Sequence, residues 1–191
     1  MAEKVHFLPA DLRIHRSQAI DLNVEFMNWF AREAYEHFKI DVTPISGLSE
    51  KEAIENWIRE YANSIVEKLC SDPHGIYYLI ELKGAIIGMG AFRQIREKTG
   101  EVKRMYIRPA YRGKGYGKAL LQQLLKKAKE FGYHSVYLDT GPFMTAAHRV
   151  YRSLGFVDCN EYPESEAQIL PPQLRSQWRY LETTLEETSA R

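Results

Sequence analysis

The chain has 191 residues, which is enough for one domain with a full-sized hydrophobic core. Its hydrophobic content of 45% and aromatic content of 12% are typical of a globular protein and exclude an intrinsically disordered one. A net charge of +1 gives no general attraction to nucleic acid, and no apolar run is long enough to span a membrane. The two cysteines and six histidines lack metal-ligand or redox spacing, so we expect a cytoplasmic protein without a metal site.

Two helices are predicted in the first third of the chain. Apolar residues recur at helical spacing over residues 19–38, and a second apolar stripe covers residues 54–69. Ser49 and Glu52 have the spacing of a capping box at the start of the second helix. A strand before these helices is only faintly indicated, by the sequence VHFLPAD.

The middle of the chain changes to strand patterns. The segments IYYLIEL and AIIGMGAFRQI, joined by a Lys83-Gly84 turn, predict a β-hairpin. A third strand, EVKRMYI, begins at Glu101, and a helix follows from Gly117 until Gly132 ends it. After that helix the patterns predict a strand at 135–140, a short helix at 145–154, a strand at 155–159, a polar loop at 160–173 and a last strand at 177–185.

The order of these elements indicates the fold class. A strand, a crossover helix and a second strand place the strands at Glu101 and Ser135 side by side and parallel, whereas the hairpin is antiparallel. The predicted class is therefore α/β, with helices and a mixed, mostly antiparallel sheet. We expect one domain over residues 1–191, made of a helical part at 1–75, a core at 76–158 and a C-terminal part at 159–191.

The stretch RPAYRGKGYGKA, residues 108–119, places three glycines and four basic residues between a strand and a helix. A P-loop is excluded because Gly113 and the Gly117-Lys118 pair are one residue too close and Ala119 has no hydroxyl. The dinucleotide-binding fingerprint is excluded because Lys118 stands where its last glycine is required. Glycines and a helix N-terminus expose backbone N–H groups, so we expect this loop to bind a pyrophosphate rather than to be a solvated basic turn.

Together with the strand EVKRMYI and the downstream sequence AAHRVYRSLGF, this loop resembles the GNAT superfamily of acetyl-CoA-dependent N-acetyltransferases. The resemblance covers roughly Ile76 to Val157. It implies a three-layer fold whose one parallel βαβ pair lies at the acyl-CoA site. It also implies acetyl-CoA as co-substrate and a small-molecule or peptide amine as acceptor, with residues 1–75 and 159–191 shaping the acceptor side.

The resemblance also implies the cofactor-binding residues. In the family the pyrophosphate of coenzyme A lies on the loop, and the pantetheine arm pairs with the preceding strand as an added strand would. The two central strands splay apart there, often with a bulge. The matching positions are Met105, Tyr106 and Ile107 on the strand, and Arg112, Gly113, Lys114, Gly115, Tyr116, Gly117 and Lys118 on the loop.

Two catalytic residues are implied in the same way. Tyr151 matches the tyrosine that family members commonly carry near the coenzyme A sulfur, where a phenol protonates the departing thiolate. The alternative is that Tyr151 only packs in an apolar stripe. Glu101 falls where several members carry a glutamate base; the alternatives are a solvated turn glutamate and a base acting through water. The backbone N–H of Ile107 is the expected donor to the oxyanion.

Less specific patterns bear on the acceptor. The loop at 160–173 contains three glutamates and no lysine or arginine, and such an acidic rim suits a cationic amine, although a solvated loop explains it equally well. The three glutamates are Glu161, Glu164 and Glu166, and Asp139 is a candidate to face the same cleft. Lys103, Arg104 and Arg108 are expected around the ribose 3′-phosphate or on the surface rather than in a nucleic-acid interface.

The predicted function is N-acetylation by direct transfer in a ternary complex, because Cys70 and Cys159 lie outside both motifs and offer no covalent relay. Two alternatives stay open: a non-catalytic acyl-CoA-binding or regulatory module of the same fold, and a transferase that uses a longer acyl-CoA. The identity of the amine and the oligomeric state are open as well, although homodimers are common in the family.

Overall fold

The structure is a computed structural model that describes residues 4–40 and 51–185. Its strands form one seven-stranded sheet in the order β1-β2-β3-β4-β5-β7-β6. All neighbouring strands are antiparallel except β4 and β5, which are parallel, so the predicted mixed sheet is confirmed. The strands are β1 His6–Pro9, β2 Ile76–Leu82, β3 Ala85–Arg96, β4 Thr99–Ile107, β5 Ser135–Thr140, β6 Val157–Asp158 and β7 Arg179–Thr184.

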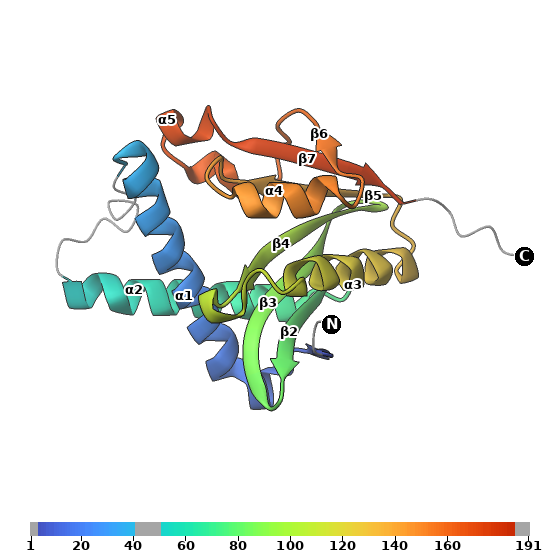
Figure 1. The fold of residues 1–191 in the computed structure, drawn as a ribbon, viewed down its shortest axis with the longest axis horizontal. Coiled ribbons are helices and arrows are strands. Elements are labelled where there is room, and N and C mark those ends of the chain that lie inside the picture. Colours follow the sequence, from blue (N-terminus) through green and yellow to red (C-terminus); the bar gives the residue numbers. More distant parts are fainter. Residues whose placement is uncertain (1–3, 41–50, 186–191) are drawn as a thin grey trace, which may run out of the picture.

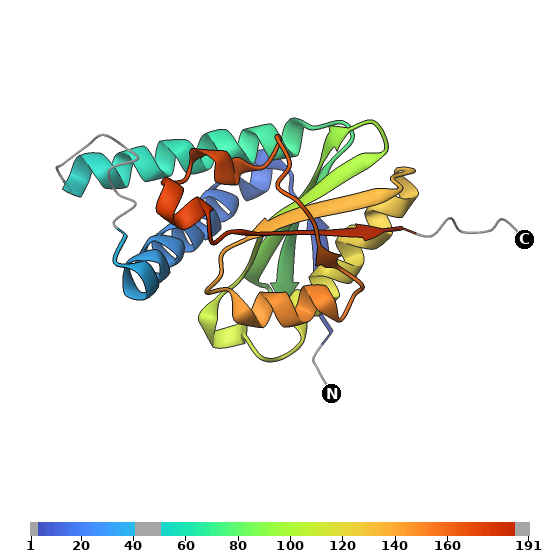
Figure 2. The same cartoon turned by 90° about the horizontal axis from the view of Figure 1, so that it is seen from above.

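Helices cover both faces of this sheet, as Figures 1 and 2 show. The helices are α1 Leu12–Phe38, α2 Lys51–Ser71, α3 Tyr116–Glu130, α4 Thr145–Arg152 and α5 Pro172–Arg175, with 3-10 turns η2 Pro109–Tyr111 and η3 Glu166–Ile169. One core lies between the sheet and α3 with α4, and a second lies between the sheet and α1 with α2. The result is the expected three-layer arrangement. Among the described helices, none combines the length and apolar character needed to cross a membrane.

The N-terminal elements differ in extent from the predicted ones. Helix α1 begins at Leu12 instead of residue 19, after Asp11, whose carboxylate accepts a hydrogen bond from the Arg13 backbone N–H at 2.9 Å. The first turns of α1 are largely exposed, so they carry no apolar periodicity from which a helix could be predicted. The faint first strand is real: β1 pairs with β2 at the edge of the sheet. Ser49, of the predicted capping box, lies outside the described residues.

Two further boundaries are corrected. Strand β4 begins at Thr99, so Glu101 lies within the strand and not at its start. The segment predicted as a polar loop contains η3 and the start of α5. The Ser165 side chain caps η3, and Pro171 and Pro172 stand at the cap and the first position of α5.

Strands β4 and β5 separate soon after they begin to pair. Their ladder runs only from Thr99 to Glu101 on β4, opposite Ser135 to Tyr137 on β5. Beyond Glu101, β4 stays paired with β3 as far as Ile107, but its other edge has no partner in β5. The expected splay is therefore present in this fold.

The expected bulge is present as well. The register between β3 and β4 shifts between Met89 and Ala91, so the β4 segment opposite them contains an additional residue. Arg104 lies in that segment with φ of 55°, a left-handed conformation that is uncommon for a residue other than glycine. The bulge thus changes the direction of the β4 side chains at the point where β5 turns away.

Candidate active site

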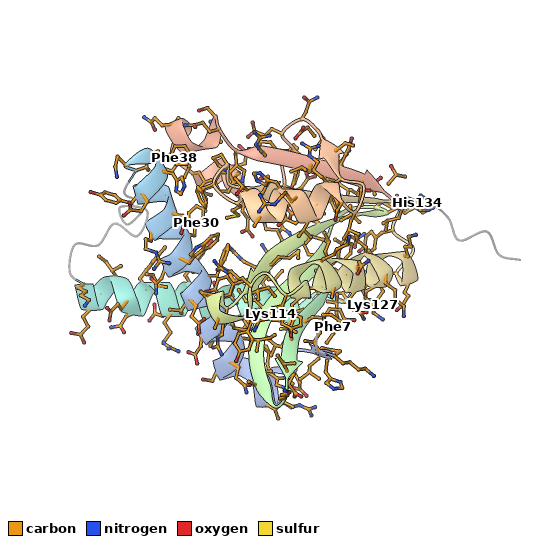
Figure 3. The ribbon with its side chains drawn as sticks, viewed as in Figure 1. Phe7, Phe30, Phe38, Lys114, Lys127 and His134 are labelled. Atoms are coloured by element: carbon orange, nitrogen blue, oxygen red, sulfur yellow. The ribbon has the colours of Figure 1, made fainter. Side chains whose placement is uncertain are left out.

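The glycine loop is built to present backbone N–H groups. Gly113 and Gly115 have φ of 77° and 85°, and Gly115 caps α3 without any side-chain cap. The first hydrogen bond within α3 joins the Ala119 N–H to the Gly115 carbonyl at 3.0 Å, so the N–H groups of residues 116–118 have no partner within the helix. Lys114 and Lys118 are exposed beside them (Lys114 is labelled in Figure 3). This arrangement suits a polyanion.

The side chains of Tyr116 and Arg112 point away from the exposed N–H groups of the loop. The Tyr116 side chain is buried in the core under α3, so only its backbone is available to a ligand. The Arg112 guanidinium lies 5.0 Å from the ring of Trp29 and 5.4 Å from the ring of Tyr106, and its Nε donates to the Ile107 carbonyl at 2.9 Å. Arg112 therefore joins the loop to β4 and to α1.

The C-terminal half of β4 places its side chains so that its backbone edge is left for a ligand. Tyr106 is buried against Phe26 and Trp29 of α1, with ring centroids 6.0 and 6.3 Å away. Ile107 packs on the core under α3, and Met105 lines a cavity beside the splay. The predicted strand and loop residues thus lie side by side.

Tyr151 of α4 reaches the same splay. Its side chain is buried, yet it lines the cavity together with Met105 and Met144. No described residue forms a hydrogen bond with its hydroxyl, which leaves that group available to a ligand. Burial, and then the charge of Asp139, raise the pKa of Tyr151, so the phenol is protonated at neutral pH. Tyr151 packs in the core as the apolar stripe predicted, and also faces the cavity.

Glu101 lies beneath the cavity and does not line it. Its carboxylate is fully buried and accepts hydrogen bonds from the Arg93 Nε and from the Tyr162 hydroxyl, both at 2.6 Å. Lys103 Nζ is 3.4 Å from Oε1, the carboxylate oxygen that also accepts from Tyr162. Burial raises the pKa of Glu101, whereas the charges of Lys103 and Arg93 act against that rise. The alternative that Glu101 is a solvated turn residue is wrong, because β4 carries it into the middle of the sheet.

The cavity has a volume of about 390 Å³ and opens between α1, α2, β4, β5 and η3. Its walls are mostly aromatic and aliphatic. Phe26 and Phe30 come from α1, Trp57 and Tyr61 from α2, Leu170 from the segment after η3, and Trp178 from just before β7. Figure 3 shows Phe30 on the side of α1 that faces the C-terminal segments.

A group of paired charges forms one side of this cavity. Lys103 Nζ lies 3.0 Å from Asp139 and 3.7 Å from Glu166, and Asp139 also accepts from the Ser165 hydroxyl at 2.8 Å. Burial by itself would raise the pKa of Asp139 and of Glu166, but Lys103 holds both below the ordinary range. Arg104 Nη2 donates to Glu166 at 2.8 Å.

These pairs correct two expectations. Lys103 is buried and Arg104 is largely buried at the cavity, instead of lying near a ribose phosphate or on the surface, because the bulge carries them inward. Arg108 pairs with Glu25 of α1 at 2.7 Å. The glutamates at 160–173 are not a free acidic rim: β3 and β4 supply Arg96 for Glu164 and Arg104 for Glu166, cations that are absent from the loop's own sequence.

The sequence model of the Acetyltransferase (GNAT) family matches residues 25–156. The chain belongs to the GNAT acetyltransferase family. The chain is 30% identical over 109 residues to the uncharacterized N-acetyltransferase YjgM of Escherichia coli, and this match covers 52% of this chain and 65% of that protein.

A second curated relative is the N-acetylaspartate synthetase of Xenopus tropicalis, 34% identical over 104 residues. That match covers 54% of this chain and 38% of the relative, so the similarity is to part of a longer protein.

Among solved structures, the PaiA N-acetyltransferase from Thermoplasma acidophilum in complex with coenzyme A gives a TM-score of 0.67 at 18% identity, covering 96% of this chain and all of that one. YncA from Salmonella typhimurium with acetyl-CoA gives 0.57 at 20% identity, covering 99% and 98%. These structures share the fold.

The GNAT motifs did not predict the residues that line the cavity. Phe30, Arg104 and Trp178 all line it, but they lie on different elements and outside any short motif. A local signal for the bulge at Arg104 is the irregular alternation of apolar residues in EVKRMYI, which lies in β4. The described part of the chain contains no group of three or more histidine, cysteine or acidic side chains placed to hold a metal ion.

Proposed function

We propose that this GNAT protein transfers the acetyl group of acetyl-CoA to the primary amine of a small molecule, directly and in a ternary complex. The observation that carries the proposal is the divergence of β4 from β5 beyond Glu101. It leaves a free strand edge between a glycine loop with unpaired N–H groups and the hydroxyl of Tyr151. The coenzyme A and acetyl-CoA complexes of the structural neighbours support this choice of co-substrate.

The residues fit coenzyme A along its length. The N–H groups of residues 116–118 and the exposed Lys114 and Lys118 would hold the pyrophosphate, and Gly113 and Gly115 leave no Cβ to block its approach. The free edge from Met105 to Ile107 would pair with the pantetheine amides. The thioester would then lie at the cavity, beside Met105 and Tyr151.

In the proposed reaction the amine nitrogen attacks the thioester carbonyl carbon, a C–N bond forms and the C–S bond breaks. The departing sulfur takes the proton of the Tyr151 hydroxyl, and the amine gives up its own proton. Tyr151 suits this role because its hydroxyl is protonated and has no partner among the described residues. The Ile107 N–H remains the predicted donor to the oxyanion.

The base role predicted for Glu101 stays a prediction, and the geometry favours a positioning role. Its carboxylate is engaged by Arg93 and Tyr162 and does not reach the cavity wall. We propose that Glu101 holds Lys103 in place, and that Lys103 in turn orients Asp139 and Glu166. Water then serves to carry the amine proton away.

The wider description of the protein is proposed with the same function. Residues 1–191 would act as one unit, with the acetyl-CoA core at 76–158 and acceptor parts at 1–75 and 159–191. Cys70 and Cys159 are free thiols, which is compatible with the cytoplasmic location proposed here. The partner would be a small amine rather than a nucleic acid, and a homodimer remains open.

The test is release of coenzyme A thiol from acetyl-CoA in the presence of single amines: amino acids, polyamines, aminoglycosides and small peptides. We expect release that depends on one class of amine. Tyr151→Phe should lower kcat by about 100-fold or more and leave the acetyl-CoA Kd within about twofold, because only the acid is lost. Tyr35→Phe, at an exposed tyrosine of α1, is the matched control and should change neither value.

Three results would contradict the proposal in different ways. Acetyl-CoA binding without thiol release for any amine would favour the non-catalytic module. Turnover with longer acyl-CoA only would favour the alternative donor. Absence of acetyl-CoA binding would show that the assignment of residues 112–118 is wrong.

A further inference from the structure

We propose that the acceptor is a free amino acid with a large apolar or aromatic side chain, whose carboxylate binds Arg104 and whose side chain occupies the aromatic cavity. This inference rests on the proposed N-acetyltransferase function. It adds to that function the chemical class of the acceptor and the residue that recognises it.

The first observation is an unsatisfied donor on Arg104. Its side chain is only 13% exposed, and its Nη2 donates to Glu166. The Nε atom, in contrast, is buried and has no hydrogen-bond partner. A buried N–H on a charged group is rarely left unpaired, because the desolvation cost is then uncompensated. Because Nη2, the other nitrogen on that edge, already donates to Glu166, the Nε N–H offers a ligand carboxylate one charge-assisted hydrogen bond.

The backbone makes this orientation a fixed feature of the site. Arg104 occupies the bulge of β4 at a positive φ, and its guanidinium lies 5.7 Å from the ring of Phe26. A cation over an aromatic face is held in place by the ring quadrupole. Arg104 is therefore oriented at the cavity before any ligand binds, which reduces the entropic cost of recognition.

The neighbouring charges limit the ligand to one carboxylate. Lys103 also lines the cavity, but Asp139, Glu166 and Glu101 all lie within 4.0 Å of its Nζ. A ligand carboxylate there would displace protein carboxylates that are already bound. Glu166 and Asp139 instead favour the ammonium group of the ligand. A zwitterionic amino acid presents one charge of each sign and so matches this wall.

The remaining walls select the side chain. Phe26, Phe30, Trp57, Tyr61 and Trp178 line the cavity, and the rings of Trp57 and Tyr61 are stacked 5.3 Å apart at an interplanar angle of 4°. Burial of apolar ligand surface against such walls is favourable, whereas a second carboxylate would be desolvated without a free cation. We therefore expect phenylalanine-like amino acids to be preferred over aspartate.

The experiment compares four acceptors at saturating acetyl-CoA: phenylalanine, phenylalanine amide, 2-phenylethylamine and aspartate. The amide and the amine keep the aromatic group and the nucleophile but lack the carboxylate. We expect kcat/KM for phenylalanine to exceed the values for the other three by about 10- to 100-fold, the range for a hydrogen bond to a charged group. Equal or better use of 2-phenylethylamine, or a preference for aspartate, would overturn the inference while leaving the enzyme an N-acetyltransferase.

Substitution of Arg104 tests the residue itself. Arg104→Gln should raise KM for phenylalanine by about 10- to 100-fold and leave KM for 2-phenylethylamine within about twofold. A variant that failed to fold would lose both activities, so Arg104→Lys, which keeps the charge but not the Nε donor, provides a second measurement with an intermediate rise. Arg96→Gln is the control, since Arg96 is half-exposed, pairs with Glu164 and does not line the cavity.

A direct binding measurement separates this inference from the proposed function. Phenylalanine is titrated calorimetrically into protein saturated with coenzyme A. If no amine is acetylated but phenylalanine binds and Arg104→Gln weakens that binding, the proposed enzyme function fails and the carboxylate site stands. If phenylalanine is neither bound nor acetylated, the carboxylate site is wrong.

Discussion

The glycine loop with the end of β4 and the aromatic cavity beside it offer different kinds of chemical group to a ligand. The loop and strand occupy one continuous stretch, residues 105–118, and offer mainly backbone N–H groups and carbonyls. The cavity is assembled from α1, α2, β4, β5, η3 and the segment before β7, and offers side chains. Recognition by backbone requires a particular local conformation, and hence a local pattern of glycines. Recognition by side chains from separate elements requires no such pattern.

The charges of the two regions follow the same division. Lys114 and Lys118 of the loop are exposed to solvent, where a polyanion can reach them. The cations of the cavity are buried and mostly paired with carboxylates from other elements. The loop is thus a candidate general anion site, whereas the cavity combines a defined shape with the unpaired Arg104 Nε and with the Tyr151 hydroxyl, which has no partner among the described residues. The following predictions test that difference, from the largest expected effect to the smallest.

Glu101→Ala should have the largest effect on stability. The substitution leaves the Arg93 Nε and the Tyr162 hydroxyl without their acceptor, and unsatisfied buried donors of this kind cost about 3 kcal/mol of unfolding free energy. Chemical denaturation measures this loss. Glu67→Ala, at an exposed pair with Arg16, is the control and should change stability little.

Glu101→Gln tests whether Glu101 only positions its neighbours and is not itself the base. We expect the acid limb of the pH profile of kcat/KM to persist in Glu101→Gln, because a positioning residue does not titrate in the rate-limiting step. Disappearance of that limb would restore the base role predicted from the sequence.

Gly115→Ala should affect cofactor binding specifically. An alanine at a φ of 85° is strained by roughly 1 kcal/mol, and relief of that strain would turn the loop N–H groups away from the pyrophosphate. We expect KM for acetyl-CoA to rise about tenfold. Gly84→Ala is a close match, since Gly84 has a φ of 81° in the β2–β3 turn; it should lose similar stability with an unchanged KM. Equal KM values for both variants would argue against the loop as the pyrophosphate site.

Lowering the pH should destabilise the fold at the cavity wall, because Asp139 becomes protonated there. Burial raises its pKa, but Lys103 and the hydrogen bonds from Ser165 and Trp178 outweigh burial and place the pKa below the ordinary value. The stabilisation is therefore present above the ordinary carboxyl pKa of about 4 and is lost as pH falls through the folded value. Glu166 acts in the same sense, whereas the raised pKa of Glu101 acts in the opposite sense. Thermal melts across the acid range should show a shallower pH dependence for Asp139→Asn than for the wild type.

The double variant Cys70→Ser with Cys159→Ser should have the smallest effect. Neither thiol lines the cavity, and burial raises the pKa of each to about 11, so neither is a ready nucleophile. We expect kcat within about twofold of the wild type. A large loss of kcat with normal stability would contradict direct transfer and indicate an acyl-cysteine intermediate.

The sequence was sufficient for the order of the elements, the parallel β4–β5 pair, the glycine-rich turn before α3 and the position of Tyr151 on α4. Each of these depends on interactions between residues close in the chain: the period of apolar side chains, the conformational freedom of glycine, and the handedness of a strand–helix–strand connection. The predicted boundaries were wrong where the chain is exposed, as in the first turns of α1, because exposed turns carry no periodic pattern of apolar residues.

Only the tertiary structure decided the chemistry of the cavity. The burial of Glu101, the inward turn of Arg104 and the pairing of Glu164 and Glu166 depend on contacts such as Arg104 with Glu166 and Glu101 with Tyr162, which join residues more than sixty positions apart. The charge of a carboxylate and the availability of a guanidinium depend on their neighbours in space, through burial and Coulomb attraction, and not on their neighbours in the chain. For that reason the sequence by itself was enough to predict a coenzyme A site at residues 105–118, and only the folded chain gave grounds for proposing a class of amine.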